Sequence, residues 1–136
     1  MKFEESLKQN YAKKVPIDKF RAKNLIKSAE QAIETAKSIF LNENSAKTIL
    51  RELYEGFREY CEALGYAKGY KFLSHEIITY FIEDILKDNI ISGKFDRYRK
   101  IRNGINYYGK NVDIETVKEA LKEIPELIKE LQKFRN

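Results

Sequence analysis

The sequence contains little of what disulfide-linked, fibrous or membrane-spanning proteins require. Its one cysteine, Cys61, excludes an internal disulfide. Because Cys61 lies among apolar residues at helical spacing, we expect a small buried side chain in a protein of the reducing cytoplasm. The 136 residues include only six glycines and two prolines, which favours a helical globular chain over a disordered one. No apolar run approaches the length that crosses a bilayer, so we expect no membrane partner.

Positive and negative charges are also close to balanced. The chain has 26 lysines and arginines against 21 acidic residues, a formal net charge of +5. This modest excess permits binding to a polyanion without requiring it. The first 14 residues mix acidic and basic side chains without an apolar stretch, which predicts no signal peptide. Abundant lysine, glutamate, isoleucine and tyrosine resemble a thermophile's composition, and AT-rich genomes give much the same bias.

Apolar residues recur every three or four positions along most of the chain, which predicts amphipathic helices. The expected elements are a short helix over residues 2–11 and long helices over 18–41, 46–65, 75–86, 94–108 and 114–134, with a connector over 87–93. We expect N-caps at Asp18, Ser45, Ser74 and Asp113, and Gly109 as the end of the fourth long helix. No alternating pattern predicts a strand. The fold class is therefore all-α: one domain over residues 1–136, an up-down four-helix bundle with an additional C-terminal helix and a short N-terminal helix in an extension over 1–15.

The helix expected over 94–108 breaks the rules of an ordinary amphipathic helix. Arg102 lies four residues after Tyr98 and three before Ile105, so it points along the apolar face or its edge. Asn103 and Gly104 follow in the helix interior, where glycine alone costs about 1 kcal/mol relative to alanine. Where a sequence places a guanidinium beside the core and then weakens the helix, we expect a functional or packing requirement at that point. We expect the functional site there.

The residues around Arg102 suit the recognition of an anion. The planar guanidinium offers a fork of donors that matches phosphate, and Arg99, Asn103 and Asn106 fall within one turn of it. Gly104 lets a ligand or a second helix approach closely. The alternative is structural: Arg102 pairs with a buried carboxylate or carbonyl group, and Gly104 only permits tight packing. The sequence leaves both interpretations open, and it shows no metal-ligand spacing and no glycine-rich phosphate loop, so we expect no metal and no cofactor.

Three segments in order resemble one protein family. The strings are FRAKNLIKSAE at 20–30, GYKFLSHE at 69–76 and RYRKIRNGINYYG at 97–109. They resemble the first long helix, the approach to the third and the signature helix of the HEPN (higher eukaryotes and prokaryotes nucleotide-binding) family, over roughly residues 16–134. The family's signature is an arginine, usually a polar residue next, and a histidine four to six positions after the arginine. The resemblance implies a small helical bundle that binds nucleotides or RNA.

The chain departs from the signature at the histidine. The resemblance implies that Arg102 steers the scissile phosphate of RNA in a metal-independent endoribonuclease, but Tyr107 stands where the histidine would fall, between Asn106 and Tyr108. A tyrosine phenol has an unperturbed pKa of about 10, whereas histidine titrates near neutrality. A phenol is therefore a poor general base. We expect a nucleotide- or RNA-binding protein with impaired catalysis; the alternative is an active ribonuclease that uses Arg102 with Tyr107 or His75.

His75 is the only histidine of the chain. It is either an exposed residue at the start of a helix or part of a composite site with Arg102. A helix N-terminus lowers the pKa of histidine, which suits a neutral base, and it also attracts anions. The sequence does not place His75 relative to Arg102.

The resemblance also implies partners. It implies a homodimer whose two signature helices line a shared cleft, with Gly104 and the apolar residues of 77–86 at the interface. It implies a minimal nucleotidyltransferase as partner in a toxin–antitoxin or defence pair. In such pairs the nucleotidyltransferase adenylylates a tyrosine two residues after the histidine. Gly109 holds that position here, so the candidate acceptors are Tyr107 and Tyr108. The alternative is structural: Tyr108 packs on the apolar face of the helix, and Tyr107 is partly exposed. A helical dimeric adaptor without a ligand is the remaining alternative.

Overall fold

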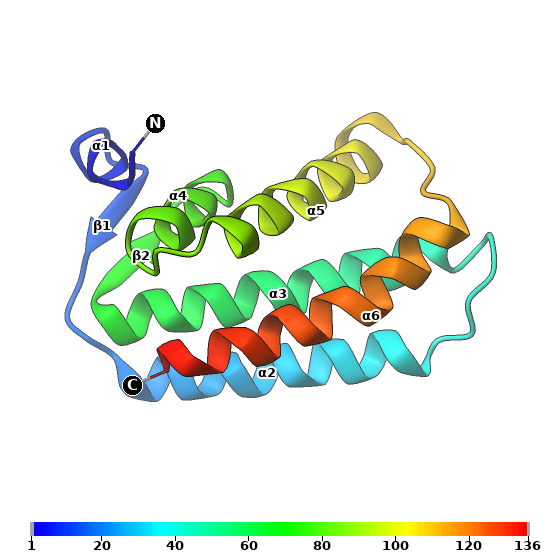
Figure 1. Cartoon of the computed structure of the whole chain (residues 1–136), viewed down its shortest axis with the longest axis horizontal. Helices are drawn as coiled ribbons and strands as arrows, with labels where there is room; N and C mark the ends of the chain where they lie inside the picture. Colours follow the sequence, from blue (N-terminus) through cyan, green and yellow to red (C-terminus); the bar gives the residue numbers. More distant parts are fainter. Residues whose placement is uncertain (1, 136) are drawn as a thin grey trace.

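The computed structural model describes residues 2–135, and it confirms an all-α bundle (Figure 1). The elements are α1 (Phe3–Lys8), β1 (Ala12–Lys14), α2 (Lys19–Ser38), α3 (Ala46–Lys68), β2 (Tyr70–Phe72), α4 (Glu76–Asp84), α5 (Asn89–Tyr108), α6 (Ile114–Leu131) and the 3-10 turn Gln132–Phe134. In Figure 1, α2 lies below α3, α6 crosses beside both, and α4 and α5 lie above α3. Of the connector expected over 87–93, residues 89–93 instead begin α5.

The central element is α3, which packs against α2, α4, α5 and α6. Its apolar residues face several neighbours at once, and Leu53, Tyr54 and Phe57 are fully buried. On the side toward α2, a Cβ atom at Gly56 would lie 2.7 Å from the Cδ1 atom of Ile33. Glycine therefore lets the two long helices approach closely, and most of the buried side chains of α2 are small alanines. Cys61 is also fully buried in α3, as expected, and burial raises the pKa of its thiol.

Aspartates begin three of the helices. The side chains of Asp18, Asp88 and Asp113 each accept a hydrogen bond from a backbone N–H three residues further on. Each cap satisfies a donor that the first helical turn leaves without a partner. Asp18 and Asp113 were predicted, whereas Asp88 was not, because its cap falls in the expected connector. Gly109 ends α5 with a φ of 62°, as predicted.

The structure differs at two predicted serine caps. Ser45 holds the N-cap position of α3 as predicted, but its side chain makes no capping hydrogen bond. The hydroxyl instead donates to the carbonyl of Phe40 at 2.6 Å and accepts from the Asn42 N–H at 2.9 Å, which holds the α2–α3 loop. Ser74 lies one residue too early, because the N-cap position of α4 is His75. Serine competes for local backbone groups in loops as readily as at helix starts, and the sequence does not separate these roles.

A short strand pair contradicts the prediction of no strands. β1 and β2 are antiparallel, with Ala12 opposite Phe72 and Lys14 opposite Tyr70. Three residues are too few for an alternating pattern to be visible in the sequence. The pair joins the N-terminal segment to the chain that leads into α4, and Phe3 of α1 is buried there. Residues 1–15 are therefore, over their described part, packed against the bundle.

The apolar residues of α4 belong to the core. Ile77, Ile78, Phe81 and Ile82 are all buried within the chain, and Leu86 after the helix is buried as well. The expectation that residues 77–86 present an apolar face to a second copy is wrong for these five side chains. They face α1, α3 and α5 instead, and Phe81 also contacts Phe72 of β2, which is why this short helix is apolar on most sides.

Phe3 provides a test of the N-terminal segment. Its ring is 1% exposed and makes edge contacts with Tyr70, Phe72 and Phe81 at centroid distances of 5.1, 6.2 and 5.7 Å. We expect Phe3→Ala to lower the free energy of unfolding by about 3–5 kcal/mol, since it leaves a cavity among these rings. Urea denaturation measures the loss. The matched control is Phe20→Ala, 77% exposed, with an expected change within about 0.5 kcal/mol. Equal losses in the two variants would contradict this packing.

Candidate functional site

The core-facing side of α5 follows the predicted spacing for most of its length. Phe95, Tyr98 and Ile105 are buried, and the Tyr98 hydroxyl donates to the Glu123 carboxylate of α6 at 2.5 Å. Tyr108, expected on this face, is 77% exposed. Figure 1 shows the last turn of α5 rising away from α3, which leaves no core for Tyr108 to contact.

Arg102 lies half-buried at the edge of this face. The guanidinium carbon lies 5.3 Å from the centroid of the Tyr54 ring, a cation–π contact, and 6.0 Å from that of Tyr107. One hydrogen bond is formed, from Nη1 to the Oδ1 atom of Asn103 at 3.2 Å. Among residues 2–135 no carboxylate forms an ion pair with Arg102, so the structural alternative of a buried acidic partner is not found there. Most of the guanidinium donors remain available.

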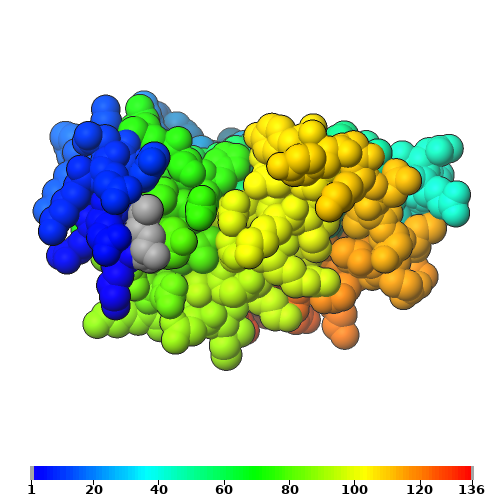
Figure 2. All heavy atoms as spheres, turned by 90° about the horizontal axis from the view of Figure 1, so that it is seen from above, coloured from blue at the N-terminus to red at the C-terminus, as the bar shows by residue number. Residues whose placement is uncertain are grey.

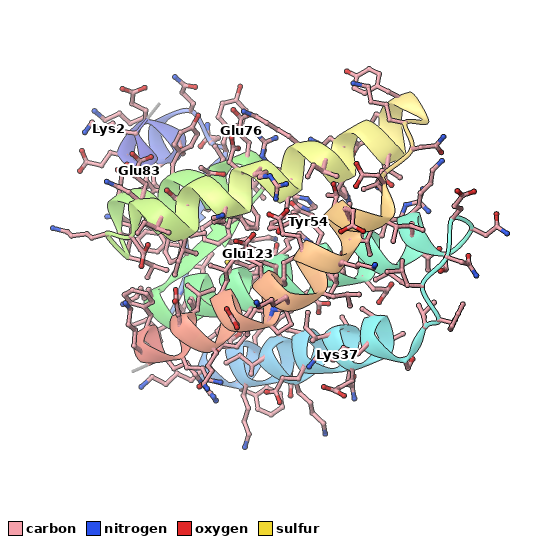
Figure 3. All side chains as sticks on the ribbon, turned by 45° about the vertical axis from the view of Figure 1, so that its right-hand side comes forward. Lys2, Lys37, Tyr54, Glu76, Glu83 and Glu123 are labelled. Carbon is pink, nitrogen blue, oxygen red and sulfur yellow. The ribbon has the colours of Figure 1, made fainter. Side chains whose placement is uncertain are left out.

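Tyr54 connects Arg102 to His75. Its side chain is fully buried, and its hydroxyl lies 3.1 Å from the Nδ1 atom of His75. The two ring centroids are 5.9 Å apart. Figure 3 shows Tyr54 in the interior, between α5 and the helices below it. His75 is half-buried and not an exposed helix start, and the structure brings it together with Arg102 on one aromatic ring.

The environment keeps both aromatic groups neutral. Burial, together with the positive charges of Arg58 and Arg102, lowers the pKa of His75 to about 4. Burial also raises the pKa of the Tyr54 phenol, although the same arginines oppose that shift. At neutral pH, His75 is therefore an uncharged imidazole and Tyr54 an uncharged phenol. The low pKa expected from the helix start is present, but desolvation is its largest cause.

The neighbouring arginines are already neutralised. Arg99 donates to the Oδ1 atom of Asp96 through Nε at 3.1 Å and Nη2 at 2.7 Å. Arg58 forms ion pairs with Glu55 and Glu62 on its own helix. Arg99 was predicted to bind phosphate, but its donors are engaged within α5. Arg102 differs from both because no acid accompanies it.

The last turns of α5 add further polar groups. Asn106, a predicted ligand-binding residue, accepts a hydrogen bond from the Nε atom of Arg51 on α3 at 2.8 Å. A Cβ atom at Gly104 would lie 3.3 Å from the Cδ atom of Lys110, so the glycine makes room for a lysine of its own chain. The Lys110 N–H also donates to the Gly104 carbonyl at 3.1 Å. Within residues 2–135, Arg51 and Lys110 form no ion pair. Three cations thus gather around the end of α5.

Tyr107 and Tyr108 are both exposed, at 69% and 77%. The Tyr107 ring lies beside Arg102, and the Tyr108 ring centroid lies 6.0 Å from the Nζ atom of Lys110. Each ring therefore presents an open face next to a cation. The expected packing of Tyr108 is wrong, and Tyr107 is more exposed than expected.

A cleft of about 590 Å³ lies between the α2–α3 loop and the α5–α6 connection. It is lined by Glu43, Asn44, Lys47, Asn111, Val112, Asp113 and Ile114. None of the site residues predicted from the sequence lines it. Lys47 lies one helical turn before Arg51, so the cleft adjoins the cations at the end of α5 along α3. In the part of the chain that the structure describes, no group of three or more His, Cys, Asp or Glu side chains converges as metal ligands do.

Sequence reasoning missed three residues of this site, all on α3. Tyr54 lies on the apolar stripe of the helix expected over 46–65, which predicts only a core position, and Arg51 and Arg58 were not considered. A signal was present: Arg51, Tyr54 and Arg58 are spaced by three and four residues, so they share one helix face. A buried tyrosine also needs a hydrogen-bond partner for its hydroxyl, which could have pointed to a polar neighbour such as His75.

Comparison of the chain with protein-family models, with curated proteins and with solved structures finds no match. None of the described helices is long and apolar enough to cross a membrane. The residues around Arg102 are therefore the basis on which a function can be proposed.

A pH titration of the single histidine tests the electrostatics of the site. NMR of His75 should show an imidazole that stays neutral down to about pH 5, with a pKa of about 4. Arg102→Ala should raise this pKa while leaving it below about 6.5, since burial remains. Because the unfolded chain binds this proton at higher pH than the folded chain, the free energy of unfolding should fall as the pH falls from about 6.5 to about 4.

The control for this titration is Arg97→Ala. Arg97 lies on the same helix and pairs with Glu119 at 3.2 Å. It should leave the His75 pKa unchanged. A histidine that titrates near 6.5 in the unaltered protein would show that His75 is not held against Tyr54.

Proposed function

We propose that this chain is a HEPN-like protein that binds a nucleotide or RNA through a phosphate at Arg102 and lacks competent catalysis. One observation carries the proposal: Arg102 is half-buried against Tyr54, it forms one hydrogen bond, and no described carboxylate neutralises it. A guanidinium taken partly out of water without an acidic partner is costly, and a bound phosphate would compensate that cost.

The surroundings of Arg102 support an anionic ligand. Arg51 and Lys110 are exposed and free of ion pairs in the described chain, so their charges add to that of Arg102. Asn103 and Asn106 supply amide groups on the same turns of α5. Arg99 and Arg58 contribute less, because Asp96, Glu55 and Glu62 already satisfy them. Their ion pairs lie within α3 and within α5, where they support the turns of their own helix.

Impaired catalysis follows from the chemistry of the residues near Arg102. Tyr107 stands where the family signature has its histidine, and a phenol is a weak base at neutral pH. A second candidate function is favoured by one contact: Tyr54 holds His75 near Arg102, and His75 is uncharged at neutral pH. A neutral imidazole there can accept the proton of an attacking ribose hydroxyl. An active metal-independent ribonuclease is therefore the runner-up.

The proposal extends to partners that the resemblance implies. A homodimer would place two Arg102 side chains near one axis, where repulsion between like charges favours a bound anion. A minimal nucleotidyltransferase partner, in a toxin–antitoxin or defence pair in the cytoplasm, would find Tyr107 and Tyr108 accessible for modification, since both are exposed. If Arg102 has no ligand, the remaining function is that of a dimeric helical adaptor.

Substitution of Arg102 tests the binding proposal. We expect Arg102→Ala to weaken binding of AMP and of a short RNA by about 10- to 100-fold, the value of one or two charge-assisted hydrogen bonds. Fluorescence anisotropy with labelled ligands measures both affinities. Arg97→Ala, which removes the same side chain from the opposite edge of α5, should bind as the unaltered protein does. Unchanged affinity in Arg102→Ala would contradict binding at Arg102.

A cleavage assay separates the two candidate functions. Purified protein, without metal, is incubated with tRNA and total RNA beside Arg102→Ala and His75→Ala. We expect intact RNA in every case, because the signature position holds a tyrosine in place of histidine, the side chain suited to proton transfer at neutral pH. Fragments with 2',3'-cyclic phosphate ends that both substitutions abolish would establish the ribonuclease and overturn the non-catalytic proposal.

A further inference from the structure

The net charge of the chain resides in one segment. Residues 13–27 contain six lysines and arginines and one carboxylate, an excess of five that equals the formal net charge of the whole sequence, +5. The rest of the chain is therefore electrically balanced. All six cations are exposed, and we name them the lysine-rich surface: Lys13, Lys14, Lys19, Arg21, Lys23 and Lys27.

Little in the described chain neutralises the lysine-rich surface. Its one ion pair within residues 2–135 joins Arg21 to Asp18 at 3.9 Å, and Asp18 also caps α2. Lys13 stands directly opposite Lys71 in the strand pair, an arrangement of like charges that destabilises antiparallel strands. Arg135 lines the same shallow pocket as Lys19 and Lys23 and adds a further cation. Uncompensated repulsion of this kind is relieved by an anion bound from outside.

The lysine-rich surface is remote from the end of α5. Figure 1 shows the start of α2 at one end of the bundle and the α5–α6 connection at the other. Seen from above in Figure 2, the blue N-terminal segment and the orange α5–α6 connection again lie toward opposite ends. The 23 residues of α3 alone span about 35 Å along this direction. A mononucleotide cannot reach from one end to the other, whereas a polynucleotide can.

We propose that the lysine-rich surface binds the phosphates of an RNA strand, and that the ligand of the Arg102 site is a polynucleotide rather than a mononucleotide. The ligand class rests on the proposed function. Five of the six cations are lysines, compact charges on flexible stems that contact a phosphate backbone without reading its sequence. Together with Arg102, they give the strand two separated points of attachment.

Two other partners fit this surface less well. A membrane-binding helix buries a continuous apolar face in the lipid, but the apolar residues of α2, from Ala22 to Ala36, are buried in the bundle. Only Ile17 and Phe20 are large exposed apolar side chains in the segment. Protein interfaces, in turn, are depleted of lysine. A polyanion with regularly spaced charges matches the lysines best.

The test compares RNA affinity at several salt concentrations for the unaltered protein and for Lys19→Gln/Lys23→Gln/Lys27→Gln. The probe is a labelled single-stranded RNA of about 20 nucleotides. We expect the triple variant to bind about tenfold more weakly at low salt, and the slope of log K against log salt to fall by about two, since three phosphate contacts are lost. AMP binding, which reports Arg102 alone, should stay unchanged.

The matched control removes three exposed lysines of α6 through Lys118→Gln/Lys122→Gln/Lys129→Gln. An equal loss of RNA affinity in the control would show that only net charge matters and would overturn the proposal. An unchanged salt slope in Lys19→Gln/Lys23→Gln/Lys27→Gln would also overturn it. So would loss, in that variant, of binding to anionic phospholipid vesicles without loss of RNA binding. If instead Arg102→Ala leaves RNA affinity unchanged while the α2 lysines still govern it, the lysine-rich surface stands and the Arg102 proposal falls.

Discussion

The packing of Tyr54 holds the candidate site together. This residue lies at the point where α3 meets both α5 and the start of α4, and its ring also packs on Phe95 at a centroid distance of 5.6 Å. A fully buried hydroxyl must find a hydrogen-bond partner, and His75 provides it. The same ring gives Arg102 an aromatic face to rest on. One side chain of the core thus fixes two polar groups that come from different helices.

Charge is distributed around this point by a simple physical rule. Arginines that lie near the core with carboxylates beside them, such as Arg58 and Arg99, form closed ion pairs that stabilise neighbouring helix turns. Arg102 and Arg51 form no ion pair within residues 2–135, and both lie near the C-terminal end of α5. Of the exposed cations of α2, Lys19, Lys23 and Lys27 likewise form no ion pair within residues 2–135, whereas Arg21 and Lys37 pair with Asp18 and Glu34. The molecule therefore separates charges that maintain the fold from charges that are available to an external anion.

The sequence predicted the helices well because their cores follow the 3.6-residue period, and Asp18, Asp113 and Gly109 marked their ends correctly. It failed where the signal is shorter than that period. Three-residue strands show no alternation, the Ser45 side chain holds a loop without capping α3, and α4 begins one residue later than Ser74 predicts. For the site, the oddity of Arg102 in α5 was visible, but Tyr54 was not, because a tyrosine on an apolar stripe looks like any core residue. Which residues meet across helices depends on tertiary packing, and one sequence does not encode it in a readable pattern.

The strand pair has a consequence for how the chain acquires its structure. The N–H of Phe3 donates to the Asp84 carboxylate at 2.7 Å, across 81 positions of sequence, whereas α2 and α3 are neighbours joined by a short loop. Closing a long loop costs more entropy than closing a short one, so contacts between α2 and α3 form early and the N-terminal closure comes late. During synthesis, Phe3 leaves the ribosome before β2 and α4 and is buried only once both have formed. Docking of α1 and β1 is thus the step that completes the fold.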